Sequence, residues 1–266
     1  MNLSELGVGL TIYICLIACL LGLVMGSFLN CMAIRIVNGE SIARGRSHCM
    51  SCGHVLGVKD LVPLFSWLST KGKCRYCGEP ISIRYPITEL VSAICYVAVV
   101  LKFGVSFQTI EFLILTSLML VISFCDIEDY IIPDRFIITG ILVRIAYLAF
   151  ESASGIMYGN EWIDSLIGGL SISLPVLIVA LVMEKILKRD AMGGGDIKLL
   201  FMIGIYFSWP VNLLSMLISC IIGIIIGLAL RRKNERLIPF GPAICAGSFI
   251  GMICGLDIIT AYLGLF

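Results

Sequence analysis

Long apolar stretches recur along most of this chain, and they constrain its fold more than any other feature. A helix needs about 20 consecutive apolar residues to cross the roughly 30 Å hydrocarbon core of a bilayer. The sequence contains about eight stretches near that length, at 8–32, 87–103, 107–125, 132–150, 163–186, 195–209, 211–230 and 239–264. This pattern predicts an all-α polytopic membrane protein.

Composition supports this prediction and narrows the possible partners. Mean hydropathy is +1.03 and only 14% of the residues are charged, so a single soluble core could not hide the apolar side chains. A net charge of +1 argues against general nucleic-acid binding. Residues 1–11 contain no Lys or Arg, so a cleaved secretion signal is not expected. The expected partner is the lipid bilayer.

Basic residues gather at alternate junctions between the stretches. Eight of the 19 Lys and Arg residues lie in 35–84, and most of the others lie near 185–198 and 231–236. Positive junctions stay on the cytoplasmic side of a membrane, so these junctions are predicted to be cytoplasmic and both termini to face outward. Arg144 is an exception, because it lies roughly 15 Å into the fourth stretch. An unpaired cation is costly there, so we expect Arg144 to face the bundle interior or to extend to the interface.

The polar insert 37–86 is too small to build a large core and needs a further constraint. It contains Cys49-x-x-Cys52 and Cys74-x-x-Cys77, with 21 residues between the two pairs. This is close to the spacing of four-cysteine zinc sites. Each pair is followed by a glycine that suits a tight turn around a metal: Gly53 and Gly78. Two disulfides are the alternative, but a reducing cytoplasm favours a closed, structural Zn²⁺ site.

Acidic residues cluster at two predicted cytoplasmic ends of the apolar stretches. Four carboxylates lie within the nine residues 126–134: Asp126, Glu128, Asp129 and Asp134. Asp196 directly follows three glycines, which allow close helix approach. Two neighbouring aspartates can hydrolyse a peptide, one activating water while the other, protonated, polarises the carbonyl. Acids at a membrane boundary more commonly cap helices or form ion pairs, and the acids alone leave both explanations open.

Several segments, in order, resemble the type IV prepilin peptidases, a family of membrane aspartyl proteases with a G-x-G-D motif. The resemblance covers nearly the whole chain and includes the paired cysteines. The matching segments are G-S-F-L-N at 26–30, P-L-F-S-W-L at 63–68, G-K-C at 72–74, R-Y-P-I-T-E-L at 84–90, G-G-G-D at 193–196 and I-P-F-G-P at 238–242.

The resemblance implies a function and a set of site residues. The catalytic aspartates would be Asp126 and Asp196, with Asp129 as the alternative for the first. The enzyme would sit in the bacterial cytoplasmic (inner) membrane and remove short basic leaders from type IV prepilin or pseudopilin precursors. Relatives with the four-cysteine insert also methylate the new N-terminus with S-adenosylmethionine. No nucleotide fingerprint is visible, and Gly72 and Lys73 are the candidate residues for this cofactor.

Three other interpretations predict different features. A proton-coupled transporter should show internal repeats and acids near the bilayer midplane. A presenilin-like intramembrane protease would leave the cysteine insert unexplained, and a zinc-bearing scaffold would not need Asp196. We divide the chain into a first transmembrane helix at 1–36, a zinc-binding insert at 37–86 and a protease core of about seven helices at 87–266.

Overall fold

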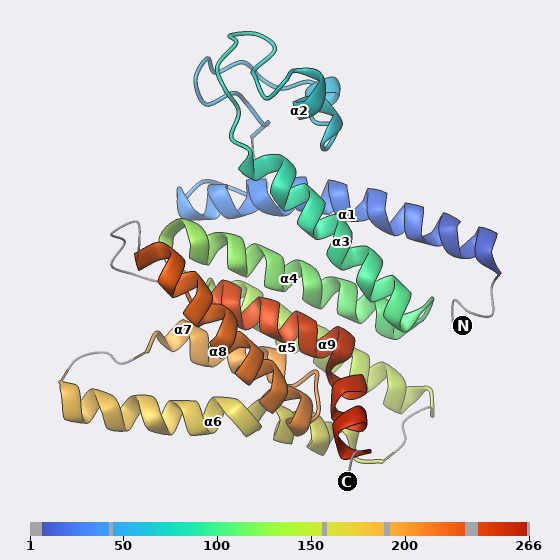
Figure 1. Ribbon diagram of the computed structural model, residues 1–266, viewed down its shortest axis with the longest axis vertical. Coiled ribbons are helices and arrows are strands. Elements are labelled where there is room, and N and C mark those ends of the chain that lie inside the picture. Colours follow the sequence, from blue (N-terminus) through green and yellow to red (C-terminus); the bar gives the residue numbers. More distant parts are fainter. Residues whose placement is uncertain (1–6, 43–44, 156–158, 189–191, 232–238, 265–266) are drawn as a thin grey trace. The chain divides into compact units, whose positions relative to one another are not determined.

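The computed structural model describes residues 7–42, 45–155, 159–188, 192–231 and 239–264, and these residues are helical apart from their connecting segments (Figure 1). The helices are α1 Val8–Val37, η2 Val58–Asp60, α2 Phe65–Ser69, α3 Arg84–Phe103, α4 Phe107–Asp129, α5 Asp134–Ala153, α6 Glu161–Leu187, α7 Gly194–Gly204, α8 Trp209–Arg231 and α9 Gly241–Leu263. In the described residues, seven of them are long and apolar enough to cross a membrane. The protein is therefore an all-α, multi-pass membrane protein, as predicted.

The sixth apolar stretch, 195–209, forms the short helix α7 in place of a full-length span. Its 11 residues rise only about 16 Å, which is about half the hydrocarbon thickness. The chain turns over 205–208, and α8 begins with Trp209 and Pro210. Proline lacks an N–H and is favoured in the first turn of a new helix. The apolar run is continuous in sequence, but its backbone breaks into two helices.

Contacts within the chain divide it into two compact units, Met1–Phe124 and Cys125–Phe266. The three-part division drawn from the sequence stays a prediction. In the first unit α1 packs along α3 (Figure 1). Gly22 and Gly26 form a G-x-x-x-G pair on α1. A Cβ added at Gly22 would lie 2.6 Å from the Cα of Ala93, and one at Gly26 would lie 2.8 Å from the Cα of Glu89. The two backbones approach this closely only because neither glycine has a side chain.

A single methyl group at this contact should destabilise the first unit. We expect Gly26→Ala to lower the stability of the protein in detergent by about 1–3 kcal/mol, because the helices must move apart. Gly9→Ala is the matched control on the same helix, since a Cβ there meets nothing within 4 Å. Thermal unfolding of both variants measures the effect. Equal midpoints for the two variants would contradict the close α1–α3 contact.

Small residues also bring together the helices of the second unit. On α9, Gly247, Gly251 and Gly255 recur every four residues, and they face Ser219, Ser215 and Val211 of α8. A Cβ at Gly204, the last residue of α7, would lie 2.8 Å from the backbone oxygen of Gly168 on α6. Helix α7 also contacts α5 and α9. The short helix that carries Asp196 is therefore enclosed by three longer helices.

Candidate active site and metal centre

Asp126 lies near the end of α4 and is buried, with 5% of its surface exposed. The backbone N–H of Gly241 donates a hydrogen bond to its Oδ2 at 2.9 Å. Gly241 is the first residue of α9, and helix N-termini present unpaired N–H groups that favour a carboxylate. A Cβ at Gly241 would lie 2.8 Å from the same oxygen. The glycine of the I-P-F-G-P segment therefore leaves room for the carboxylate that its amide binds.

Asp196 lies in the first turn of α7 and is half-buried. The preceding Gly195 packs against Ile132, with only 3.0 Å between a Cβ added there and the Ile132 Cβ. The Asp126 carboxylate lies near enough to Asp196 for the two to repel each other electrostatically. The structure thus brings together the two aspartates that the sequence singled out, with Asp126 beside the N-terminus of α9 and Asp196 in the first turn of α7. A partly buried carboxylate pair of this kind can divide the acid and base roles of hydrolysis.

The other acids of the first cluster lie apart from this pair. Asp129 and Glu128 are exposed at the end of α4. Asp134 forms an ion pair with Lys198, 2.8 Å from Oδ1 to Nζ, and both side chains are more than half exposed. Exposed ion pairs contribute about 0–1 kcal/mol. Burial and a hydrogen bond therefore distinguish Asp126 from Asp129, the alternative left open by the sequence.

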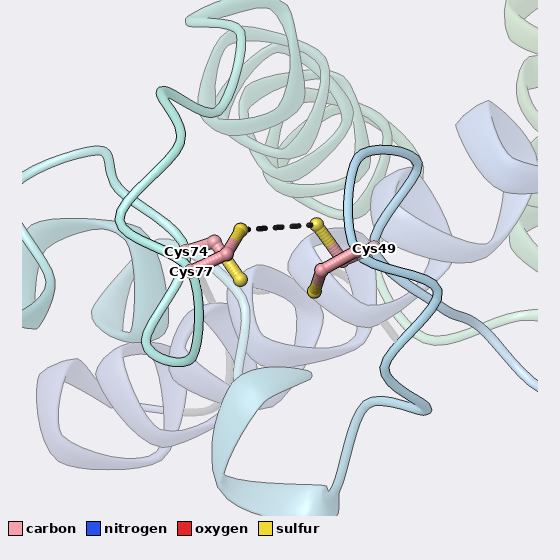
Figure 2. Close-up of side chains that lie close together, drawn as sticks. Cys49, Cys74 and Cys77 are labelled. Carbon is pink, nitrogen blue, oxygen red and sulfur yellow. Dashed lines mark hydrogen bonds between the residues drawn. The ribbon is translucent and has the colours of Figure 1, made fainter.

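The four cysteines of the insert converge on one point, and Figure 2 shows three of them, Cys49, Cys74 and Cys77. Their sulfur atoms all lie within 4.8 Å of one another, and Cys49 Sγ is 3.9 Å from Cys77 Sγ. Tetrahedral Zn²⁺ with Zn–S bonds of about 2.3 Å would separate its sulfurs by about 3.8 Å. Cys49, Cys52, Cys74 and Cys77 can thus hold a tetrahedral metal ion.

Two similar turns present these sulfurs. Cys49 N–H donates to His54 O at 2.9 Å, and Cys74 N–H donates to Glu79 O at 2.8 Å. The glycine in each turn has a positive φ, +70° at Gly53 and +74° at Gly78. Backbone N–H groups of Cys52 and Ser51 lower the pKa of Cys49 to about 6. The first turn therefore favours the thiolate form of Cys49, which is the form that a metal requires.

The rest of the insert has almost no apolar core. In the part of 38–83 that the structure describes, Cys74 is the one buried apolar side chain. Asp60 supplies a polar connection, accepting hydrogen bonds from Gly57 N–H, Arg75 Nε and Tyr76 Oη at 3.0–3.1 Å. The Gly57 N–H contributes most to lowering the pKa of Asp60. Because Arg75 and Tyr76 lie between Cys74 and Cys77, Asp60 connects the second cysteine pair to η2.

Gly72 has a conformational role in the insert. Its φ is +70°, and a Cβ there would lie 2.8 Å from the Trp67 ring. Trp67 in turn donates from Nε1 to Ile81 O at 3.1 Å. Lys73 is exposed. The fold explains the glycine, and binding of S-adenosylmethionine by Gly72 and Lys73 stays a prediction.

Sequence reasoning missed two features. One is a contact between two of the motif segments, and the other is a buried polar residue. Glu89 is buried, and its Oε2 accepts a hydrogen bond from Leu64 N–H at 2.7 Å. This contact holds Leu64 at φ +58°, where non-glycine residues are rare. It joins the P-L-F-S-W-L segment to the start of α3. Asn212, a buried amide inside an apolar stretch, binds three backbone oxygens. A polar side chain within such a stretch was the available signal.

Comparison with known proteins gives matches along most of the chain. Residues 20–103 match the Bacterial Peptidase A24 N-terminal domain, and 113–228 match the Type IV leader peptidase family. A "Prepilin leader peptidase/N-methyltransferase" of Myxococcus xanthus is 35% identical over 82% of this chain and 64% of its own length, less than two thirds of that relative. Proteins of the same name from Bacillus subtilis and Pseudomonas aeruginosa are 32% and 31% identical, over 95% and 91% of their lengths and 91% and 92% of this chain. No solved structure matches the chain.

Proposed function

The chain belongs to the type IV leader peptidase family, and we propose that it cleaves the leaders of prepilin or pseudopilin precursors at a bacterial inner membrane and methylates the new N-terminus. The observation that carries this proposal is the placement of Asp126 and Asp196. Asp126 is buried and Asp196 is half-buried, they interact electrostatically, and Gly241 binds Asp126 through its amide. Neither the transporter nor the scaffold interpretation needs such a pair.

The proposed cleavage uses the two carboxylates as one acid–base unit. The ionised carboxylate removes a proton from water, whose oxygen then attacks the scissile carbonyl carbon. The protonated carboxyl donates a hydrogen bond to the carbonyl oxygen as negative charge develops there. A proton then passes to the leaving amide nitrogen, and the C–N bond breaks. The two carboxylates share this proton, so their apparent pKa values belong to the pair and not to either aspartate alone.

The proposed substrate has a short basic leader followed by an apolar helix. The apolar helix would lie in the bilayer beside the seven spanning helices. The leader would then reach the junctions rich in Lys and Arg, which are predicted to be cytoplasmic. Asp196 lies within the basic junction 185–198, and Asp126 lies at the end of α4, where it contacts Gly241 at the start of α9. A precursor anchored in this way can present one peptide bond to the aspartates without leaving the membrane.

We assign Zn²⁺ to Cys49, Cys52, Cys74 and Cys77 as a structural ion. Four thiolates complete a tetrahedral shell, so no position is left open for substrate. S-adenosylmethionine would supply the methyl group for the new N-terminal amine. Gly72 and Lys73 are the residues proposed to contact it, and both lie next to the metal-binding turn of Cys74.

Cleavage and methylation of one precursor test this function together. We expect the purified protein in liposomes to cut a model prepilin at a single bond, because only one bond can reach the aspartates while the apolar helix stays in the bilayer. With S-adenosylmethionine, mass spectrometry should show the mature chain heavier by one methyl group. The control is the precursor without its apolar helix. Failure of the wild type to cut the leader, or cutting inside the apolar helix, would contradict the proposal.

A further inference from the structure

We propose that Arg144, Ser165 and Asn212 are positioning residues, which hold Asp196 in place by binding the opposite end of α7. This inference rests on the proposed catalytic role of Asp196. Helix α7 carries Asp196 in its first turn and ends at Gly204 after only 11 residues. Its C-terminal end therefore lies deep in the second unit, where the last backbone oxygens of a helix have no partners within the helix. In a bilayer, water does not supply those partners.

Asn212, at the start of α8, satisfies part of this need. Its Nδ2 lies 3.0 Å from Gly204 O, 3.1 Å from Phe207 O and 3.0 Å from Gly168 O on α6. The side chain is buried, with 6% of its surface exposed. One amide thus connects the end of α7, the turn that follows it and the neighbouring helix α6.

Arg144 and Ser165 bind the next carbonyl. Arg144 Nε donates to Ile205 O at 3.0 Å, and the Ser165 hydroxyl donates to the same oxygen. The guanidinium also lies 5.7 and 5.6 Å from the ring centres of Tyr147 and Tyr206. Aromatic rings and a carbonyl at the negative end of a helix both stabilise a cation. These contacts explain how an arginine is tolerated in the middle of an apolar helix.

Helix α7 is also held along its length by α5. In its first half Lys198 pairs with Asp134, and just beyond its C-terminal end Tyr206 Oη donates to Gly140 O at 2.6 Å. The contact with Arg144 completes this series, so the two helices run parallel. The Lys198–Asp134 pair is exposed and weak. The buried contacts near the C-terminal end therefore set the direction of α7.

A short helix transmits a change at one end to the other. If α7 is about 16 Å long, a tilt of about 4° around its C-terminal end moves its first turn by about 1 Å. A misplacement of about 1 Å in a reacting group can lower a rate about 100-fold. Substrate binding by the apolar helix of the precursor should change much less. The geometry therefore predicts an effect on kcat larger than that on KM.

The test measures cleavage kinetics of the full-length protein in liposomes. We expect Arg144→Met and Asn212→Leu to lower kcat about 100-fold while KM stays within about threefold. Arg144→Lys keeps the positive charge and a hydrogen-bond donor, so its kcat should be about tenfold higher than that of Arg144→Met. Ser165→Ala removes one hydroxyl with little change in volume. Ser165 and Arg144 bind the same carbonyl oxygen, so the losses of kcat in Ser165→Ala and Arg144→Lys should not add up in the double variant. The matched control is Arg135→Met, an exposed arginine on the same helix.

Two further readouts separate positioning from general loss of structure. A displaced Asp196 changes its interaction with Asp126, so the limbs of the pH–kcat profile should move. Methylation of a precut peptide should stay near the wild-type rate. The proposal is overturned if Arg144→Met and Asn212→Leu cleave as fast as the Arg135→Met control, or if cleavage and methylation fall in proportion with an unmoved pH profile. Full activity of Asp196→Asn would instead overturn the proposed function.

Discussion

Asp126→Asn and Asp196→Asn should each lower the rate of leader cleavage roughly 1,000-fold or more, because an amide can neither take a proton from water nor replace a shared acidic proton. Asn keeps the size of each side chain, so helix packing should change little. Asp126→Asn retains an oxygen that can accept the Gly241 N–H. Single-turnover cleavage of a purified prepilin in liposomes, followed by mass spectrometry, measures these rates.

Asp129→Asn is the matched control, because Asp129 lies on the same helix as Asp126 and is exposed. We expect it to cleave within about twofold of the wild type, as surface substitutions have small effects. The double variant Asp126→Asn/Asp196→Asn should be no slower than either single variant, since members of one catalytic unit are not additive. If Asp129→Asn loses most of its cleavage activity while Asp126→Asn keeps it, the catalytic aspartate of α4 is Asp129 and not Asp126. Activity in both Asp126→Asn and Asp196→Asn would reject the pair.

Cys74→Ser should remove the metal and unfold the insert. The described part of 38–83 has almost no buried apolar side chains, so its folded state depends on the four sulfurs. Binding of structural Zn²⁺ supplies about 10–16 kcal/mol in small zinc domains. We expect about one zinc per chain in the wild type and a loss of most of it in Cys74→Ser, as measured by elemental analysis. Limited proteolysis should then cut between residues 45 and 83.

Cys254→Ser is the control for this change, because Cys254 is an exposed cysteine in α9 and lies outside the cluster. It should keep the metal and the proteolysis pattern of the wild type. Far-ultraviolet circular dichroism should stay strongly helical in both variants, since most of the helices lie outside the insert. Unchanged zinc in Cys74→Ser would contradict the site. Two disulfides in freshly purified protein would favour the alternative that the cysteine spacing left open.

The sequence alone determined the features that depend on short-range pattern. Apolar runs set the spanning helices, because the bilayer imposes a minimum length on each of them. The two C-x-x-C pairs defined the metal-binding set, because each pair with its glycine forms its own turn. The order of motifs also identified the family. Each of these signals lies within about 30 residues of chain or in the order of such segments.

The tertiary structure decided what depends on distant residues. Four acids lie within nine positions, and burial together with a hydrogen bond from Gly241, 115 residues away, distinguishes Asp126 from its neighbours. The run 195–209 has the composition of a span, but α7 ends at Gly204. Side chains at 144, 165 and 212 stabilise the end of the helix there, because they donate hydrogen bonds to its last backbone oxygens. Hydropathy reports how a segment partitions into lipid, whereas partners for backbone oxygens are set by helix packing, which no local pattern encodes.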